Sequence, residues 1–265
     1  MLRKVLPFVI PTTLPRELGG GRHPKNHSTI LLKNNMKLDS YSIIARLFPG
    51  IISAIPLFVL HFFLLRPKLG EFWEELLGFK VVSDITISFV FLFAFIQLSR
   101  FVSKEIFEKR VFNNGQSLPT TDFLLYLDTY FSQEYTDKVH EKIKNDFGIK
   151  IPTLIQEKSD QLKSRKLIGE AVSHMRVRVG KGNLVGQHNA EYGFWRNLAG
   201  GSVVAFVISV INIFVFLFIL YNQIAFWTSI VLACGYLLHL LFAKRLITSH
   251  GRDYAKVLIQ EYMTN

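Results

Sequence analysis

Four apolar stretches constrain this chain more than any other feature of its sequence. They cover about residues 47–65, 82–98, 199–221 and 224–243. A helix rises about 1.5 Å per residue and needs roughly 20 residues to cross a hydrocarbon layer about 30 Å thick, and each stretch approaches that length. Lipid offers backbone groups no hydrogen-bond partners, so such segments must be helical. The sequence therefore predicts an all-α integral membrane protein with four transmembrane helices.

The Lys and Arg residues predict how these spans are oriented. Residues 1–46 hold eight basic and two acidic groups, residues 99–197 hold sixteen and twelve, and residues 244–265 hold four and two. Residues 66–80 are balanced, with three of each. Basic residues near the ends of spans stay on the cytoplasmic side. We therefore expect a multi-pass protein with both termini cytoplasmic and two short loops outside.

The predicted organisation has five segments. A basic cytoplasmic tail (1–46) precedes the first transmembrane hairpin (47–98), and a helical cytoplasmic domain (99–198) is inserted between the second and third spans. The second hairpin (199–243) and a cytoplasmic C-terminal tail (244–265) complete the chain.

The net charge of +11 is compatible with two kinds of partner, a nucleic acid and a membrane with anionic lipids. Positive-inside bias and attraction to anionic lipid headgroups account for the basic flanks. No signature of RNA or DNA binding is present, so we expect a lipid bilayer with anionic headgroups, and no nucleic acid, as the direct partner.

The N-terminus shows no secretory signal. Pro7 and Pro11 interrupt its apolar run, and no small-residue cleavage site follows. A mitochondrial presequence is the alternative, since Arg3, Lys4 and Arg16 precede the first acidic residue, but the two prolines disfavour an amphipathic helix. We expect a bacterial inner-membrane location.

Apolar residues recur at helical spacing throughout the segment 99–198. A first helix is expected to continue from the second span to Phe112, either lying on the headgroups or docking on its neighbours. A second is expected from Thr120 or Thr121 through Phe131. The buried positions expected for this helix are Phe123, Leu124, Leu127, Tyr130 and Phe131.

Three further helices complete the predicted domain. One begins near Ser132 and ends at Gly148, with Val139, Ile143 and Phe147 on one face. Another spans about 159–179, and a glycine-rich loop follows it. The run 188–198 begins the helix of the third span. The buried positions expected for the helix at 159–179 are Leu162, Ile168, Val172, Met175 and Val179.

Catalytic and metal-binding patterns are absent from the sequence. His140, His174 and His188 stand in no recognised catalytic arrangement, and the glycines near residue 180 lack the spacing of a phosphate-binding loop. The single cysteine, Cys234, permits neither an intrachain disulfide nor a cysteine-based metal site. We expect no enzyme, no catalytic residue, no metal and no cofactor.

Four polar residues within the spans are candidates for function, because ionisable groups in a membrane tend to face a bundle interior or a wet cavity. With the predicted topology, His61 and Asp84 lie at similar depth on adjacent helices. They form an ion pair or line a vestibule, or both are simply wetted at the interface. Asn212 is expected to hydrogen-bond between helices, and His239 lies toward the inner end of the fourth span.

A second group of candidates immediately precedes the third span. Tyr192, Phe194, Trp195, Arg196 and Asn197 lie one or two helical turns before it. Aromatic residues there can anchor at the interface, and the arginine can meet headgroups. Because the inserted domain joins the membrane only here and at 99–112, we expect these residues to couple the domain to the spans.

The central segment also resembles known proteins. The runs PTTDFLLYLD (119–128), FGIKIPT (147–153) and HNAEYGFWRNLAGGS (188–202) resemble a group of poorly characterised bacterial membrane proteins with a helical cytoplasmic insert. In architecture the chain is also similar to membrane effectors of anti-phage defence. That resemblance implies a cytoplasmic module that senses infection and spans that depolarise the cell.

These observations favour an oligomeric membrane effector over two alternatives. Its cytoplasmic domain would receive a signal molecule or a soluble partner, and its oligomerised spans would perturb the membrane. The alternatives are an anchor or scaffold subunit for a soluble partner, and a small ion channel or transporter. Four spans with few polar residues and no inverted repeat leave little room for a conventional transport site.

Overall fold

Helices are the regular elements of this protein. The computed structural model describes residues 40–65, 80–113, 115, 117–180 and 182–265, and no strand occurs in these ranges. The predicted N-terminal tail up to residue 39 and the predicted loop 66–79 lie outside the described residues. All the described residues belong to one compact unit, Leu38–Asn265.

The helices follow one another in a simple order. A first helical run consists of α1 (Ser40–Ser42), the π-helical segment η2 (Ile43–Leu47), α2 (Phe48–Leu60) and a second π-helical segment, η3 (His61–Leu65). The second run consists of α4 (Lys80–Val102), η4 (Ser103–Glu108) and α5 (Lys109–Val111). The remaining helices are α6 (Pro119–Asp122), α7 (Gln133–Phe147), α8 (Leu154–Ser159), α9 (Gln161–Val179), α10 (Asn183–Phe218) and α11 (Gln223–Thr264).

Three helices of the described residues are long and apolar enough to cross a membrane. They are Ile43–Leu64, α10 and α11. This confirms the prediction of an all-helical chain with apolar helices of membrane-spanning length. The second apolar stretch, 82–98, lies within α4, whose side chains are described at residue 86 and from residue 88 onward. The fourth span stays a prediction.

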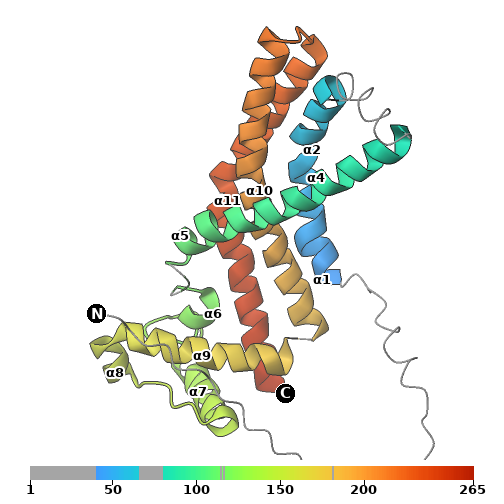
Figure 1. The fold of residues 1–265 in the computed structure, drawn as a ribbon. Helices are drawn as coiled ribbons and strands as arrows, with labels where there is room; N and C mark the ends of the chain where they lie inside the picture. The colour runs from blue at the N-terminus through green and yellow to red at the C-terminus, as the bar shows by residue number, and fades with distance from the viewer. Residues whose placement is uncertain (1–39, 66–79, 114, 116, 181) are drawn as a thin grey trace, which may run out of the picture. The chain divides into compact units, whose positions relative to one another are not determined.

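The two longest helices run side by side and extend beyond their apolar stretches at the same end (Figure 1). The apolar part of α10 begins near Ala199, but the helix begins at Asn183. The apolar part of α11 ends near Ala243, and the helix continues to Thr264. Residues 244–264, expected as a tail, are thus the second half of a long helix whose first half is apolar.

The extension of α11 passes through the core of the inserted domain. Its buried residues lie at helical spacing and pack against buried residues of α7 and α9. From α11 these are Tyr254, Ala255, Leu258, Ile259 and Tyr262, and from the inserted domain Val139, Ile143, Ile168, Val172 and Met175. This buried core therefore combines residues of the segment 99–198 with residues of the end of the chain.

The boundaries of α7 agree with the sequence prediction. The Ser132 hydroxyl accepts a hydrogen bond from the Tyr135 amide at 3.3 Å, which satisfies a free donor of the first turn. Gly148 ends the helix in the left-handed conformation, with φ of 69°, which glycine adopts without strain. Val139 and Ile143 are fully buried, as predicted.

The prediction for α9 is correct except at Leu162. Ile168, Val172, Met175 and Val179 are buried, whereas Leu162 is 47% exposed. Leu162 precedes Ile168 by six residues, which places it about 120° away from the buried face. The buried position one turn before Ile168 is occupied by Ser164 instead.

The predicted helix from Thr120 to Phe131 is wrong, because α6 ends at Asp122 and turns follow. Glu157, whose side chain is buried, accepts hydrogen bonds from the backbone amides of Tyr126 at 2.9 Å and Leu127 at 3.0 Å. In a continuing helix these amides would bond to residues 122 and 123. Phe123 and Leu124 are buried as predicted, but Leu127 is exposed because the chain turns there.

Two ionisable groups beside this turn have shifted pKa values. Burial lowers the pKa of His140, whose Nε2 lies 2.7 Å from the Leu124 carbonyl oxygen. Burial and a 2.6 Å hydrogen bond to Asp137 raise the pKa of Tyr126 to about 12. The His140 ring is therefore neutral at neutral pH and donates its Nε2 proton to the carbonyl.

The helix after α4 docks on its neighbours, which was one of the two predicted outcomes. Phe112 is buried beside Ala199 of α10 and Ala243 and Ile247 of α11. The helix ends before Asn113, which has a positive φ of 46°. This contact attaches the start of the inserted domain to both long helices.

Candidate functional site at the end of the apolar bundle

Two prolines make the first helical run dependent on its neighbours. A proline in a helix has no N–H for the carbonyl four residues earlier. Pro49 thereby frees the carbonyl of Ala45, and Pro56 frees that of Ile52. Such carbonyls must find other partners where no water is available.

Side chains of α10 and α11 supply those partners. The Asn197 amide donates to the Ala45 carbonyl at 2.5 Å, and the Tyr236 hydroxyl donates to the Ile52 carbonyl at 2.5 Å. Asn212 adds a third bond, from its amide to the Pro56 carbonyl at 2.7 Å. These three side chains thus fix the first helical run against the two long helices.

Small residues allow α10 to approach α2 and α4 closely. A Cβ atom at Gly201 would overlap the Ser53 hydroxyl oxygen, and one at Gly200 would overlap the Ser99 carbonyl oxygen. Ser53 and Ser99 are both buried. Any larger residue at Gly200 or Gly201 must force these helices apart.

Arg196 joins α10 to the helix that leads into the inserted domain. Its guanidinium lies 3.2 Å from the Glu108 carboxylate, and its backbone carbonyl accepts a 2.6 Å hydrogen bond from Ser103. The same guanidinium lies 5.5 Å from the centre of the Tyr192 ring. Because the Arg196 side chain is 16% exposed and that of Glu108 31%, the ion pair is partly shielded from water.

Tyr192 is the next contact toward the domain. Its ring stacks on Tyr254 of α11, with centroids 6.3 Å apart and planes 9° from parallel, and it also contacts Phe112. Gly251 leaves room for the ring, since a Cβ there would lie 3.4 Å from it. Tyr254 belongs to the domain core, so this stack links that core to the Arg196 ion pair.

Trp195 faces a different part of α11. Its ring stacks on His239 and on His250, with centroid distances of 6.1 and 5.6 Å. His239 also lies 2.9 Å from the hydroxyl of Ser202, through Nδ1. Phe194 contacts the Trp195 ring edge-on, with centroids 5.2 Å apart. Trp195 of α10 therefore contacts α11 both before and after Ala243, where the apolar stretch of α11 ends.

The structure brings most of the predicted residues to one place. Tyr192, Trp195, Arg196 and Asn197 each contact another helix at the end of the bundle that adjoins the segment 99–198, and Phe194 packs beside Trp195. We name these five residues with Glu108 and Tyr254 the junction cluster. Sequence reasoning missed Glu108 and Tyr254, although the spacing of Ile247, Gly251, Tyr254 and Leu258 signals a buried face that continues past the span.

The predicted intramembrane residues separate into three cases. Asn212 forms the expected interhelical bond, and His239 contacts Ser202 and Trp195. His61 lies in η3, where its Nδ1 is buried without a hydrogen-bond partner among the described residues. The side chain of Asp84 lies outside those described, so the pairing of His61 with Asp84 stays a prediction.

Within the described ranges no three His, Cys, Asp or Glu residues lie close enough together to hold a metal ion. The contacts run without interruption from Tyr254 in the buried core, through the Tyr192 ring, to the Arg196 guanidinium. Tyr192 and Arg196 belong to α10, which continues into the apolar bundle. Comparison with known proteins found no matching family model, no matching curated protein and no matching solved structure.

Proposed function

We propose that this protein is a multi-pass effector of a bacterial inner membrane, with four spans and both termini in the cytoplasm. Its helical domain receives a signal or a partner, and its spans then alter the permeability of the membrane. The observation that carries the proposal is the continuity of α10 and α11, which belong both to the apolar bundle and to the domain. A domain that served only as a tethered anchor would need no such rigid connection.

The spans are proposed to act as an oligomer. Asn212 and Phe216 of α10 are buried and contact the first helical run, at Pro56 and Phe63. Because side chains occupy this contact within one copy, we place the permeation path between copies. Exposed apolar residues such as Phe214 and Val231 are available for lipid or for another copy.

Coupling between domain and spans can be tested at Ser249, an exposed residue of α11 between the bundle and the domain core. Ser249→Pro removes a helical hydrogen bond and disrupts the helix, at a cost of about 3 kcal/mol, whereas Ser249→Ala preserves it. Membrane potential is measured with a voltage-sensitive dye in cells expressing each variant, with and without phage challenge. We expect wild type and Ser249→Ala to depolarise the cells and Ser249→Pro to be silent.

Two controls make this result decisive. Membrane fractionation must show equal amounts of the two variants, and limited proteolysis must show that the domain of Ser249→Pro is folded. Equal depolarisation by both variants would refute coupling through α11. Absence of depolarisation by the wild type would favour the anchor function, and constant, trigger-independent ion flux in liposomes would favour a simple channel.

A further inference from the structure

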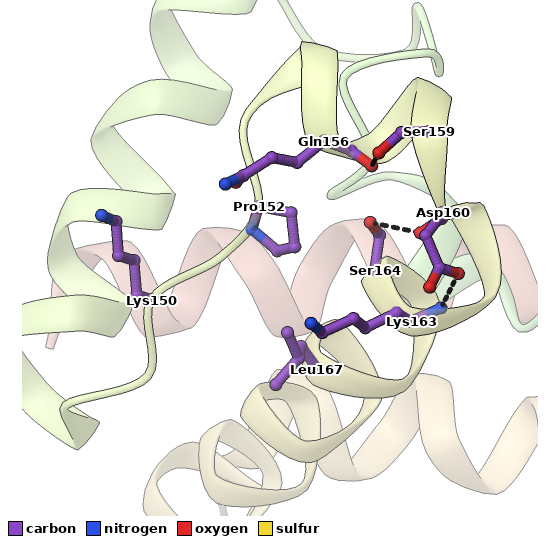
Figure 2. A pocket seen from close by; sticks show the side chains of 8 residues that line it. All are labelled: Lys150, Pro152, Gln156, Ser159, Asp160, Lys163, Ser164 and Leu167. Carbon is purple, nitrogen blue, oxygen red and sulfur yellow. Dashed lines mark hydrogen bonds between the residues drawn. The ribbon is translucent and has the colours of Figure 1, made fainter.

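A cavity of about 320 Å³ lies between the start of α9, α8 and the segment before α8. The apolar residues of its lining are Pro152 and Leu167, here called its floor, and the hydrogen-bond donors are Lys150, Gln156 and Lys163, here called its rim. In Figure 2 the side-chain nitrogens of Lys150 and Gln156 lie to one side of Pro152, and that of Lys163 lies below Pro152, beside Leu167. The cavity thus combines an apolar floor with three hydrogen-bond donors.

The three donors are available to a ligand. Gln156 accepts the Thr153 amide through Oε1 at 3.1 Å, which assigns its NH₂ group to the open side. Lys150 and Lys163 are exposed, and neither forms an ion pair with the carboxylates that the structure describes. Two ammonium groups and an amide at one rim favour an anion.

The one carboxylate in the lining is that of Asp160, and with Lys150 and Lys163 the lining keeps a net positive charge. Asp160 caps α9, and its Oδ1 accepts the backbone amide of Lys163 at 2.9 Å. In Figure 2 its carboxylate lies on the opposite side of Ser164 from the Gln156 and Lys150 nitrogens. Lys158 and Lys166, which are exposed nearby in the sequence, add further positive charge.

We propose that this cavity binds a small phosphate-bearing molecule of about the size of a mononucleotide. The phosphate would meet Lys150, Gln156 and Lys163, and a planar apolar group would lie on Pro152 and Leu167. A volume of about 320 Å³ suits one such molecule, because cavities for small ligands begin at roughly 300 Å³. Carbohydrates without charge would leave both ammonium groups unused.

The same cavity is connected to the core contacts of α9. Leu167 lines it directly before Ile168, which is buried against the domain core that includes Leu258 of α11. A ligand that orders the start of α9 therefore acts on the helix packed against α11. This step, which makes the ligand the signal, rests on the proposed function, whereas binding itself does not.

Binding is tested with the full-length protein in nanodiscs of phosphatidylcholine, by titration calorimetry with AMP as the probe. We expect AMP to bind, adenosine not to bind, and Lys150→Ala/Lys163→Ala to weaken AMP binding by about 10- to 100-fold. The matched control is Lys138→Ala/Lys144→Ala, which removes the same charge from exposed positions on α7. The control should bind AMP as the wild type does.

Three results of the binding measurement would contradict the proposal. No AMP binding up to about 1 mM, equal binding of adenosine, or equal losses in both double variants would overturn the site. The same titration is repeated in nanodiscs that contain phosphatidylglycerol. Weaker AMP binding in these nanodiscs would show that the lipid competes with AMP, and would assign the cavity to a lipid headgroup rather than to a free molecule. Binding without AMP-dependent depolarisation would leave the site intact and remove its role as the signal receptor.

Discussion

The hydrogen bond from Tyr236 to the Ile52 carbonyl allows a quantitative test of the packing between the first helical run and α11. Tyr236→Phe removes only the hydroxyl, so the ring still fills its buried position. The Ile52 carbonyl then loses the partner that replaces the missing N–H of Pro56. Interhelical hydrogen bonds in membranes contribute about 0.6 kcal/mol on average and up to roughly 1.7 kcal/mol.

This bond should lie near the upper end of that range, because the carbonyl has no N–H in its own helix. We expect Tyr236→Phe to lower the free energy of unfolding by about 1–1.5 kcal/mol. In a Pro56→Ala background the new backbone amide at position 56 can bond to the Ile52 carbonyl, and the same change should cost less than about 0.5 kcal/mol. The difference between the costs of Tyr236→Phe in the two backgrounds measures how far the contribution of the Tyr236 hydrogen bond depends on Pro56.

The assay is reversible unfolding of the purified protein in mixed micelles as the fraction of denaturing detergent rises, with all four members of the cycle compared. A control cycle uses Tyr221→Phe, because Tyr221 is 79% exposed and lies just beyond the far end of α10. Equal costs of Tyr236→Phe in both backgrounds would refute the reasoning that Tyr236 compensates for the proline. A cost near zero in the wild-type background would refute the hydrogen bond itself.

Three further predictions follow from contacts in the described residues. Gly201→Ala should lower the thermal unfolding midpoint in micelles, because its Cβ would meet Ser53, whereas Gly235→Ala, with open space around it, should leave the midpoint unchanged or raise it. Arg196→Ala should abolish depolarisation while membrane insertion is retained, and normal depolarisation would remove its coupling role. The lowered pKa of His140 means that the unfolded chain binds more protons below pH about 6.5, so domain stability should fall as pH drops below that value. His140→Gln should flatten this dependence in pH-resolved denaturation, and an unchanged slope would contradict the assignment.

Several helix boundaries of this chain can be predicted from local sequence, because their signals are local. The cap at Ser132, the glycine at 148 and the apolar run from Ala199 each act within a few residues. The turn after Asp122 could not be predicted in this way. It depends on Glu157, which is 30 residues away in the sequence from the Leu127 amide that it binds.

The junction cluster was predicted in its α10 members only. The run before the third span stands out by composition, but its partners Glu108 and Tyr254 lie 88 and 62 residues from Arg196 and Tyr192. The end of α11 does carry a sequence signal for a buried helical face. Its buried residues Tyr254, Leu258 and Tyr262 recur every four residues, which is typical of a helix with one buried face.

The central claim is that α10 and α11 connect a cytoplasmic domain to membrane-spanning segments, and labelling of single cysteines tests it most directly. With Cys234 replaced by Ala, cysteines are introduced as Glu75→Cys, Asn222→Cys, Gln161→Cys and Asn265→Cys, and intact cells are treated with a membrane-impermeant thiol reagent. The account predicts labelling of Glu75→Cys and Asn222→Cys on intact cells, and labelling of Gln161→Cys and Asn265→Cys only after the membrane is opened. Labelling of Gln161→Cys from outside the intact cell would contradict it.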